Sequence, residues 1–264
     1  MSHTYEHEHT HPHLREAAKP EAESTGKWGM VIDQDLCTGC QACVAACAME
    51  NNISFIGDTD RGEADIAYGR SMQWIRIERY WEGEYPKVTM TDYQPMMCQQ
   101  CGNAPCEPVC PVYASVHSAA EDLNLQVYNR CIGTRYCANN CPYQVREFNW
   151  RDWPLPEPMN NRLNPDVTVR NRGVMEKCTF CIQRIHAGEN AAAAEDRDVL
   201  DGEVVPACAQ ACPADAIVFG RLDDPKSEVS QKALDDRGYL HLEDLNTLPR
   251  VTYLKGGSKH GRHS

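Results

Sequence analysis

Fifteen cysteines fall into four closely spaced groups, and none lies outside them. Thiolate sulfur is a soft ligand that favours iron–sulfur clusters or zinc over hard cations. An odd number of cysteines excludes complete disulfide pairing within one chain. Numbered one to four in chain order, the groups read Cys37-x2-Cys40-x2-Cys43-x3-Cys47, Cys98-x2-Cys101-x4-Cys106-x3-Cys110-Pro111, Cys131-x5-Cys137-x3-Cys141-Pro142 and Cys178-x2-Cys181-x26-Cys208-x3-Cys212-Pro213.

Each group is a variant of the C-x2-C-x2-C-x3-C-P run that binds cubane iron–sulfur clusters. The two-residue gaps let a tight loop wrap three thiolates around one cluster, and the fourth cysteine, a helical turn further on, ligates the neighbouring cluster. The proline that follows ends the cluster loop, because it cannot continue a helix. The spacing therefore predicts clusters that share ligands between groups.

Zinc is the alternative metal for these thiols. Structural zinc sites use separated C-x2-C pairs and close with four ligands, and group four alone, with its two separated pairs, fits that description. Group one does not resemble a zinc ribbon, because it places three thiols within seven residues. Haem attachment is excluded, because no C-x-x-C is followed by histidine.

Group three lacks a cysteine at its second ligand position, where Thr134 stands. A threonine hydroxyl does not ionise at physiological pH and is a poor ligand for iron beside thiolates. A cuboidal cluster without its corner ligand tends to lack the corner iron. We therefore predict three [4Fe–4S] clusters and one [3Fe–4S] cluster; the alternative is a fourth [4Fe–4S] cluster with water or hydroxide at the open corner.

Four such groups in this order resemble the four-cluster electron-transfer subunit of the complex iron–sulfur molybdoenzyme family, over roughly residues 28–254. Three segments are similar to one branch, which holds the menaquinone reductase (Qrc) complex and alternative complex III. In alternative complex III the module is typically fused to a larger molybdopterin-like domain. In this sequence the module stands alone, and we therefore expect a separate subunit of a Qrc-type complex. The segments are Gln94-Pro95-Met96-Met97-Cys98, Tyr128-Asn129-Arg130-Cys131-Ile132-Gly133-Thr134-Arg135-Tyr136-Cys137 and Glu176-Lys177-Cys178-Thr179-Phe180-Cys181.

The resemblance implies an interleaved ligand assignment for the four clusters. Cys47 is followed by Ala48 rather than by proline, a departure that we do not expect to disturb its ligation. The implied sets are Cys37, Cys40, Cys43 and Cys212 for the first [4Fe–4S] cluster; Cys47, Cys178, Cys181 and Cys208 for the second; Cys98, Cys101, Cys106 and Cys141 for the third; and Cys110, Cys131 and Cys137 for the [3Fe–4S] cluster, with Thr134 at the vacant ligand position.

The function that the resemblance implies is electron transfer without catalysis. The clusters would form a linear wire from a large molybdopterin-like subunit to a polytopic quinone-binding membrane subunit, with the three-iron cluster at the membrane end and a multihaem cytochrome c as a further candidate partner. The alternatives are the iron–sulfur subunit of a molybdopterin sulfur-compound reductase or of a quinol-oxidising alternative complex III. A zinc-binding structural scaffold is the alternative from a different class.

Composition narrows the partners and the location. Acidic residues outnumber basic residues 38 to 26, giving a net charge of −12, which argues against a nucleic-acid-binding protein. No stretch approaches the roughly 18 apolar residues of a membrane helix. The N-terminal stretch lacks the basic start, the apolar core and the twin arginine of an export signal. We expect a peripheral membrane location on the periplasmic face by co-export with a partner, with the cytoplasmic face as the alternative.

Three cations lie beside the cysteine groups: Arg130, Arg135 and Lys177. Positive charge near a cluster favours its reduced state. The alternative is that all three are ordinary surface cations.

The resemblance implies an α+β fold of two pseudo-symmetric ferredoxin-like (bis-cluster) modules with β-hairpin insertions and long loops. Sparse regular structure and many loops favour a fold held by iron–sulfur clusters rather than by a large hydrophobic core. Residues 28–32 are predicted to form a short strand that runs into the first cysteine group. Period-two patterning predicts a hairpin over 73–93 that turns at Glu82-Gly83. A second strand pair brackets Glu121-Asp122, and a short helix covers 227–236. Two long loops are expected at 152–170 and 184–204.

This pattern divides the chain into two modules and their connections. Residues 27–93 with 174–254 form the first ferredoxin-like module, which carries groups one and four and the hairpin. Residues 94–150 form the second module, with groups two and three, and 151–173 form a proline-rich loop. Residues 1–26 are a disordered His-rich tail, with a loose metal-binding tail as the alternative, and 255–264 are a frayed tail.

Overall fold

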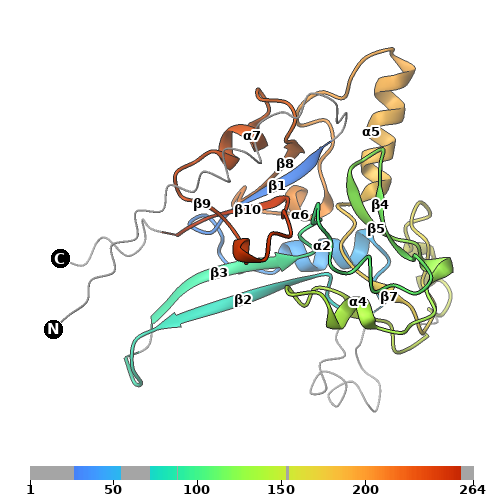
Figure 1. Ribbon diagram of the computed structural model, residues 1–264, viewed down its shortest axis with the longest axis horizontal. Helices are drawn as coiled ribbons and strands as arrows, with labels where there is room; N and C mark the ends of the chain where they lie inside the picture. The colour runs from blue at the N-terminus through green and yellow to red at the C-terminus, as the bar shows by residue number, and fades with distance from the viewer. Residues whose placement is uncertain (1–26, 55–71, 88, 153–154, 257–264) are drawn as a thin grey trace.

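A four-stranded mixed sheet forms one side of the molecule (Figure 1). The computed structural model describes residues 27–54, 72–87, 89–152 and 155–256, so the His-rich segment 1–26 and residues 257–264 lie outside the described residues. β1 pairs in parallel with β10 and antiparallel with β8, placing Met30 opposite both Val251 and Phe219. In spatial order the strands are β8 (Ile217–Arg221), β1 (Trp28–Asp33), β10 (Val251–Leu254) and β9 (Gly238–Leu240).

The side chains of β1 alternate between its two faces, and both faces are buried against hydrophobic clusters. Met30 and Ile32 face the main core, whereas Val31 packs with Val229 of the helix α7 (Glu228–Ala233). Ser227 caps α7, since its side chain accepts a hydrogen bond from the backbone N–H of Ser230. The strand and the short helix predicted from the sequence are confirmed.

Two hairpins flank the cysteine groups. β2 (Ile75–Glu82) and β3 (Thr89–Met97) project away from the body of the molecule (Figure 1), and β4 (Ser115–Ser118) pairs with β5 (Leu123–Gln126) around the predicted turn. Both hairpins are confirmed. The return strand of the first extends further than expected, to Met97, so that it delivers Cys98 directly to the site.

The remaining elements, α5 aside, are short. A second small sheet pairs β6 (Glu147–Phe148) with β7 (Met175–Glu176). Within 155–170 the described chain forms regular structure only in one 3₁₀ turn, as expected for the proline-rich loop. Among the described residues, the helices and 3₁₀ turns other than α7 are α2 (Ala42–Glu50), η1 (Tyr128–Arg130), α4 (Tyr136–Asn139), η2 (Met159–Arg162), α5 (Ile182–Ala194), α6 (Ala207–Gln210) and η3 (Glu243–Leu245).

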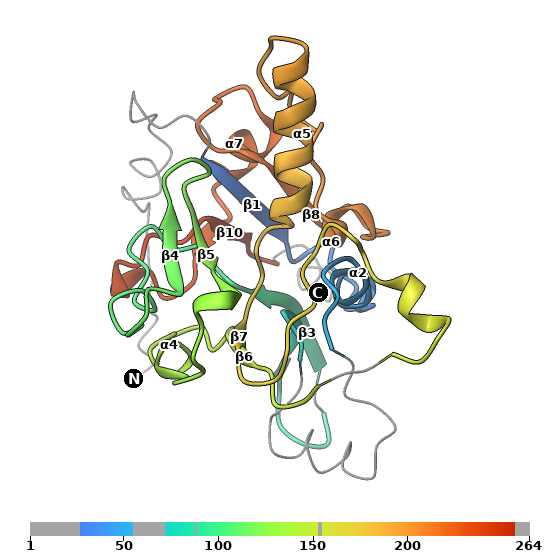
Figure 2. The ribbon, with the colours of Figure 1, turned by 90° about the vertical axis from the view of Figure 1, so that its right-hand side faces the viewer.

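The prediction of a loop over 184–204 is wrong for residues 184–194, which belong to α5, and is confirmed for residues 195–204. Alanine is the strongest helix former, and the helix buries Ile185 and Ala192 against the core. Gly188 stands where Val204 packs: a Cβ there would lie 2.5 Å from Val204 Cγ2. α5 stands beside the β4–β5 hairpin (Figure 2), where His186 Nε2 lies 2.8 Å from Glu121 Oε1.

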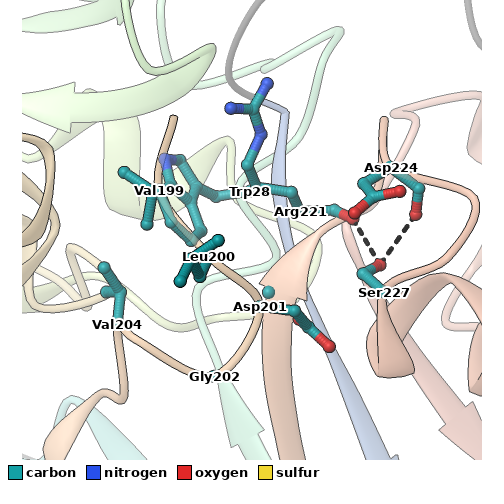
Figure 3. Close-up of a pocket in the computed structure, with 10 residues that line it drawn as sticks. Trp28, Val199, Leu200, Asp201, Gly202, Val204, Arg221, Asp224 and Ser227 are labelled. Atoms are coloured by element: carbon teal, nitrogen blue, oxygen red, sulfur yellow. Dashed lines mark hydrogen bonds between the residues drawn. The ribbon is translucent and has the colours of Figure 1, made fainter. Parts of the chain in front are cut away.

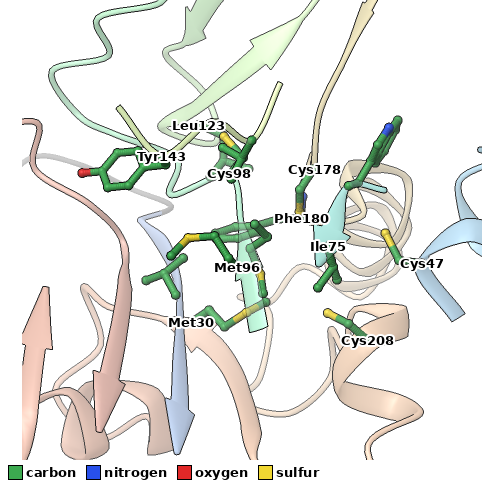
Figure 4. Close-up of a cluster of buried hydrophobic side chains, with 14 of the residues drawn as sticks. Met30, Cys47, Ile75, Met96, Cys98, Leu123, Tyr143, Cys178, Phe180 and Cys208 are labelled. Carbon is green, nitrogen blue, oxygen red and sulfur yellow. The ribbon is translucent and has the colours of Figure 1, made fainter. Parts of the chain in front are cut away.

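The main core contains cysteine thiols as well as hydrocarbon side chains. Figure 4 shows Cys47, Cys178 and Cys208 near Ile75 and Phe180. Ten of the cysteines are buried, four are half-buried and one is exposed. Within the described residues, no helix combines the length and the apolar character needed to cross a bilayer.

Candidate iron–sulfur centres

The same tight turn recurs in all four cysteine groups. In each, the residue just before the second ligand position has a left-handed backbone, which turns the chain sharply between the first two positions. In group three this residue is Gly133, so Thr134 occupies the backbone position that a cysteine occupies in the other groups. The four left-handed residues are Gly39, Gln100, Gly133 and Phe180, with φ of 67°, 48°, 73° and 56°.

A second repeat follows the last cysteine of groups two, three and four. The chain turns back after the proline, and a backbone N–H four residues beyond the cysteine reaches its sulfur. Ala114 N–H donates to Cys110 Sγ at 3.1 Å, and Ala216 N–H donates to Cys212 Sγ at 3.4 Å. In group three, burial raises the pKa of Cys141 and the backbone N–H of Val145 opposes that rise. Hydrogen bonds to sulfur are among the contacts that tune iron–sulfur clusters.

Group one departs from this pattern because Ala48 replaces the proline and α2 continues through Cys47. Four residues beyond Cys47 lies Asn51, whose side-chain Nδ2 is 3.6 Å from Cys47 Sγ and 3.8 Å from Cys181 Sγ. A side-chain amide thus stands where the other groups use a backbone N–H. Although group one lacks the proline, the sulfur of Cys47 therefore still has a hydrogen-bond donor.

The first thiol set surrounds a cavity of about 330 Å³ whose lining includes Cys37, Cys40, Cys43 and Cys212. Burial raises the pKa of Cys43 to about 11, and the neighbouring thiolates of Cys37 and Cys212 raise it as well. Cys40 is exposed. Its pKa is lowered, chiefly by the backbone N–H of Ala42.

The second thiol set is buried throughout. Burial raises the pKa of Cys47 well above its usual value, and the thiolates of Cys178, Cys181 and Cys208 act in the same direction. Burial likewise raises the pKa of Cys208. Groups one and four, far apart in the chain, therefore meet at one point.

The third and fourth thiol sets combine groups two and three. Burial raises the pKa of Cys101 to about 12, and the thiolates of Cys98, Cys106 and Cys141 act on it too. Burial raises the pKa of Cys137, which the thiolate of Cys131 also raises. Burial raises the pKa of Cys110, but the backbone N–H groups of Ser115, Val112 and Ala114 outweigh it, so that this pKa is lowered.

Neighbouring thiols also connect one set to the next. The thiolate of Cys43 raises the pKa of Cys208, which joins the first and second sets. The thiolate of Cys98 acts on Cys178, which joins the second and third. The thiolate of Cys106 acts on Cys137, which joins the third and fourth. The four sets therefore follow one another in that order.

The donor chemistry fits iron–sulfur clusters. Buried thiols crowded together resist ionisation, because each thiolate loses hydration and repels its neighbours. A positively charged metal core offsets both effects and displaces the protons. All-sulfur ligands with N–H donors at the sulfurs are the surroundings that such clusters use.

Comparison with known proteins agrees with this chemistry. The chain matches the family described as 4Fe-4S dicluster domain over residues 36–114 and 130–216, and a second family of the same description over residues 89–155. It is 43% identical over 232 residues to the menaquinone reductase iron-sulfur cluster-binding subunit of Nitratidesulfovibrio vulgaris, covering 86% of this chain and 88% of the relative. The chain belongs to the iron–sulfur subunits of the complex iron–sulfur molybdoenzyme family.

Other members of this iron–sulfur subunit family are similar along most of their length. A putative dimethyl sulfoxide reductase iron-sulfur subunit of Halobacterium salinarum is 37% identical over 236 residues, 89% of this chain and 81% of the relative. The arsenate respiratory reductase iron-sulfur subunit of a Shewanella species is 34% identical over 255 residues, 86% and 95% of the two chains. The predicted family and its iron–sulfur character are confirmed.

The cations of this iron–sulfur subunit differ from one another in burial. Lys177 is fully buried and its Nζ donates to the carbonyl of Cys178 at 2.9 Å, so the surface alternative is wrong for it. Arg130 and Arg135 are exposed, and the Arg135 guanidinium lies 4.7 Å from the centre of the Trp150 ring. A further buried cation, Arg146, touches Cys106 Sγ. Sequence analysis missed it, because no spacing marks it.

A second cavity, of about 260 Å³, lies between the sheet and the loop after α5 (Figure 3). No cysteine lines it, and its lining includes the aromatic ring of Trp28 and the apolar side chains of Val199 and Val204. Ser227 Oγ donates to the carbonyls of Arg221 and Asp224 at 2.7 and 2.8 Å. These contacts hold the turn that joins β8 to α7, and the cavity takes no part in the thiol sets.

Proposed function

We propose that this chain is the electron-transfer subunit of a menaquinone reductase-type complex and relays electrons through three [4Fe–4S] clusters and one [3Fe–4S] cluster without catalysing a reaction itself. The observation that carries the proposal is the order of the thiol sets, buried in the middle and open to solvent at both ends. When bound, the clusters supply one-electron redox chemistry. The chain holds their spacing and fixes the charges and N–H donors around them.

The proposed ligands are the four thiol sets already described, with Cys212 completing the first, Cys47 the second, Cys141 the third and Cys110 the fourth. Mutual effects on pKa support the first three sets and the pairing of Cys131 with Cys137 in the fourth; Cys110 is assigned to the fourth set from the resemblance. Thr134 supports the three-iron form, because it takes the place of the second cysteine in the recurrent turn and is exposed. Water or hydroxide at that corner of a four-iron cluster is the alternative.

Two ferredoxin-like modules related by pseudo-symmetry would explain the repeated turns. The first would comprise residues 27–93 with 174–254, the second 94–150, and 151–173 would connect them. The left-handed residue before the second ligand position and the N–H···S contact after the last cysteine occur in both modules. This repetition supports the two-module division.

The proposed partners are a large molybdopterin-like subunit at the first set, a polytopic quinone-binding membrane subunit at the fourth and, in addition, a multihaem cytochrome c. The name of the Nitratidesulfovibrio relative, a menaquinone reductase subunit, supports the quinone link. We propose a peripheral location on the periplasmic membrane face. The dimethyl sulfoxide and arsenate reductase relatives favour a second candidate, the iron–sulfur subunit of a molybdopterin reductase.

Anaerobic purification of the native complex in mild detergent tests the proposal. We expect a brown sample with iron and acid-labile sulfide, and mass spectrometry that finds the membrane and molybdopterin-like subunits. Covalent haem favours the quinone-reductase function, and molybdenum favours the molybdopterin reductase. A colourless zinc protein would overturn the electron-transfer function, and a chain recovered alone would overturn its place in a membrane complex.

A further inference from the structure

Arg146 lies buried between groups two and three, with only 6% of its surface exposed. Its Nη2 contacts Cys106 Sγ at 3.0 Å, Ser115 Oγ at 2.6 Å and Asn124 Oδ1 at 2.8 Å. Its Nη1 donates to Gln126 Oε1 at 2.8 Å. The three oxygen partners come from the β4–β5 hairpin, which therefore holds the guanidinium against the sulfur.

Within the described residues no carboxylate is in direct contact with Arg146; its charge acts on Glu107 across Asn124, whose Nδ2 donates to Glu107 Oε1. The buried Arg170, in contrast, lies 2.8 Å from Glu176. Burying an unpaired cation is costly. The sulfur of Cys106 lies within hydrogen-bond distance of Arg146 and would carry negative charge as a cluster ligand, so the charge of Arg146 acts on the thiol sets.

This charge reaches two thiol sets. Burial by itself lowers the pKa of Arg146, yet the thiolates of Cys106 and Cys137 raise it above its usual value, with Cys98 and Cys141 adding to the effect. Cys137 belongs to the fourth set and the other three to the third. The charge of Arg146 also acts to lower the pKa of Cys110, a member of the fourth set.

We propose that Arg146 is a positioning residue that raises the reduction potentials of the third and fourth clusters together. This inference rests on the proposed function. Reduction adds negative charge to a cluster, and a fixed cation in a low-dielectric interior stabilises the reduced form more than the oxidised form. Because one guanidinium acts on both sets, the two reduction potentials rise together, and the reduced state is favoured at the third and fourth clusters.

Redox titration followed by EPR spectroscopy tests the role of Arg146 in the full chain with its clusters. In Arg146→Gln we expect the reduction equilibrium of the third and fourth clusters to fall at least tenfold, which is about 59 mV for a one-electron couple. Arg146→Lys keeps the charge and should retain most of both potentials. The first and second clusters serve as internal references, because the thiols whose charges act on Arg146 belong to the third and fourth sets.

Two further variants guard against a merely structural effect. Gln126→Glu leaves Arg146 in place but gives it a carboxylate partner, so the same two potentials should fall. Arg221→Gln is the matched control, because acidic residues rather than thiolates surround that guanidinium. It should shift none of the four.

Unchanged third and fourth potentials in both Arg146→Gln and Gln126→Glu would overturn the inference, as would an equal shift of all four. If Arg146→Gln does not assemble its clusters, Gln126→Glu decides. Absence of iron in the wild-type protein would instead overturn the proposed function, so the two failures are distinguishable.

Discussion

The inner and outer thiol sets of this iron–sulfur subunit have different surroundings. In the second set all four cysteines are buried, and in the third all but Cys141 are. In the first set Cys40 is exposed, and in the fourth Cys110 and Cys131 are half-buried and Thr134 is exposed. Accessible ends suit exchange of electrons with partners, whereas a buried middle protects the sulfurs from solvent.

The difference extends to the protonation of the thiols. Burial raises the pKa of Cys47 and Cys208, whereas backbone N–H groups lower the pKa of Cys40 and of Cys110. The most buried thiols therefore depend on a metal core for charge balance, whereas one thiol at each end, Cys40 or Cys110, receives enough help from the backbone to lower its pKa. Four predictions test this contrast.

The largest difference is expected between Cys208→Ser and Cys40→Ser. Cys208 lies on α6 in the main core, so its loss should remove the second cluster and with it the packing between groups one and four. Cys40 is exposed, so its loss should affect the first cluster alone. Iron content and thermal unfolding measure both. We expect a severe loss of folded protein for Cys208→Ser and a folded protein, poorer in iron, for Cys40→Ser; equal losses would contradict the contrast.

Gly133→Ala is expected to damage one outer set. Gly133 has a φ of +73°, and a Cβ there would lie 2.3 Å from the carbonyl oxygen of Gly173. A left-handed backbone costs an alanine about 1–2 kcal/mol, and overpacking adds about 1–3 kcal/mol. Gly202→Ala is the matched control, because Gly202 also has a positive φ but a Cβ added to it would meet no atom within 4 Å.

Chemical unfolding should rank wild type, Gly202→Ala and Gly133→Ala in falling order of stability. Loss of the fourth cluster signal should accompany the last variant and not the control. Equal midpoints for the two alanine variants would show that Gly173 moves aside without cost.

Thr134→Cys should convert the fourth set into a complete four-thiol set. We expect one additional iron per chain and loss of the EPR signal that an oxidised [3Fe–4S] cluster gives, because the new thiolate can hold the corner iron. Thr134→Ser is the control and should keep the signal. A wild-type protein that already contains the additional iron and lacks the signal would contradict the three-iron assignment.

Sequence reasoning went furthest where spacing dictates geometry. The cysteine groups predicted the family, and the short run at 28–32 predicted the strand that leads into the first group. The extension of β3 to Met97 was missed because Pro95 reads as a strand breaker. That proline is tolerated, because β3 is an edge strand of a two-stranded sheet in the described part of the chain.

Contacts between distant segments explain what the sequence could not predict. Gly188 reads as an interruption of a helix until Val204 is placed against it. Asn51 becomes a donor to Cys47 only because α2 continues past the missing proline. The contacts of Arg146 could not be predicted, because they form only when the β4–β5 hairpin brings Ser115 and Gln126 to its guanidinium.

The smallest effect is expected from pH, at the hairpin that covers the third set. His117 on β4 lies 2.6 Å from Asp122 and 3.6 Å from Glu107. These two carboxylates, Glu107 more strongly, raise its pKa, and burial opposes them. A raised pKa in the folded state means that the protonated imidazole stabilises the fold. This contribution is complete below the ordinary histidine value near about 6.5 and is lost as pH rises through the raised pKa.

Comparison of wild type with His117→Gln across neutral pH isolates this contribution from those of the other histidines. The stability difference should be under about 1 kcal/mol, as for other partly exposed ion pairs, and should shrink as pH rises. His241 provides the opposite sign, since burial lowers its pKa, so stability lost by its protonation appears at low pH. A His117→Gln difference that stays constant with pH would mean that the hairpin is held over the third set by its hydrogen bonds to Arg146 rather than by the charge on His117.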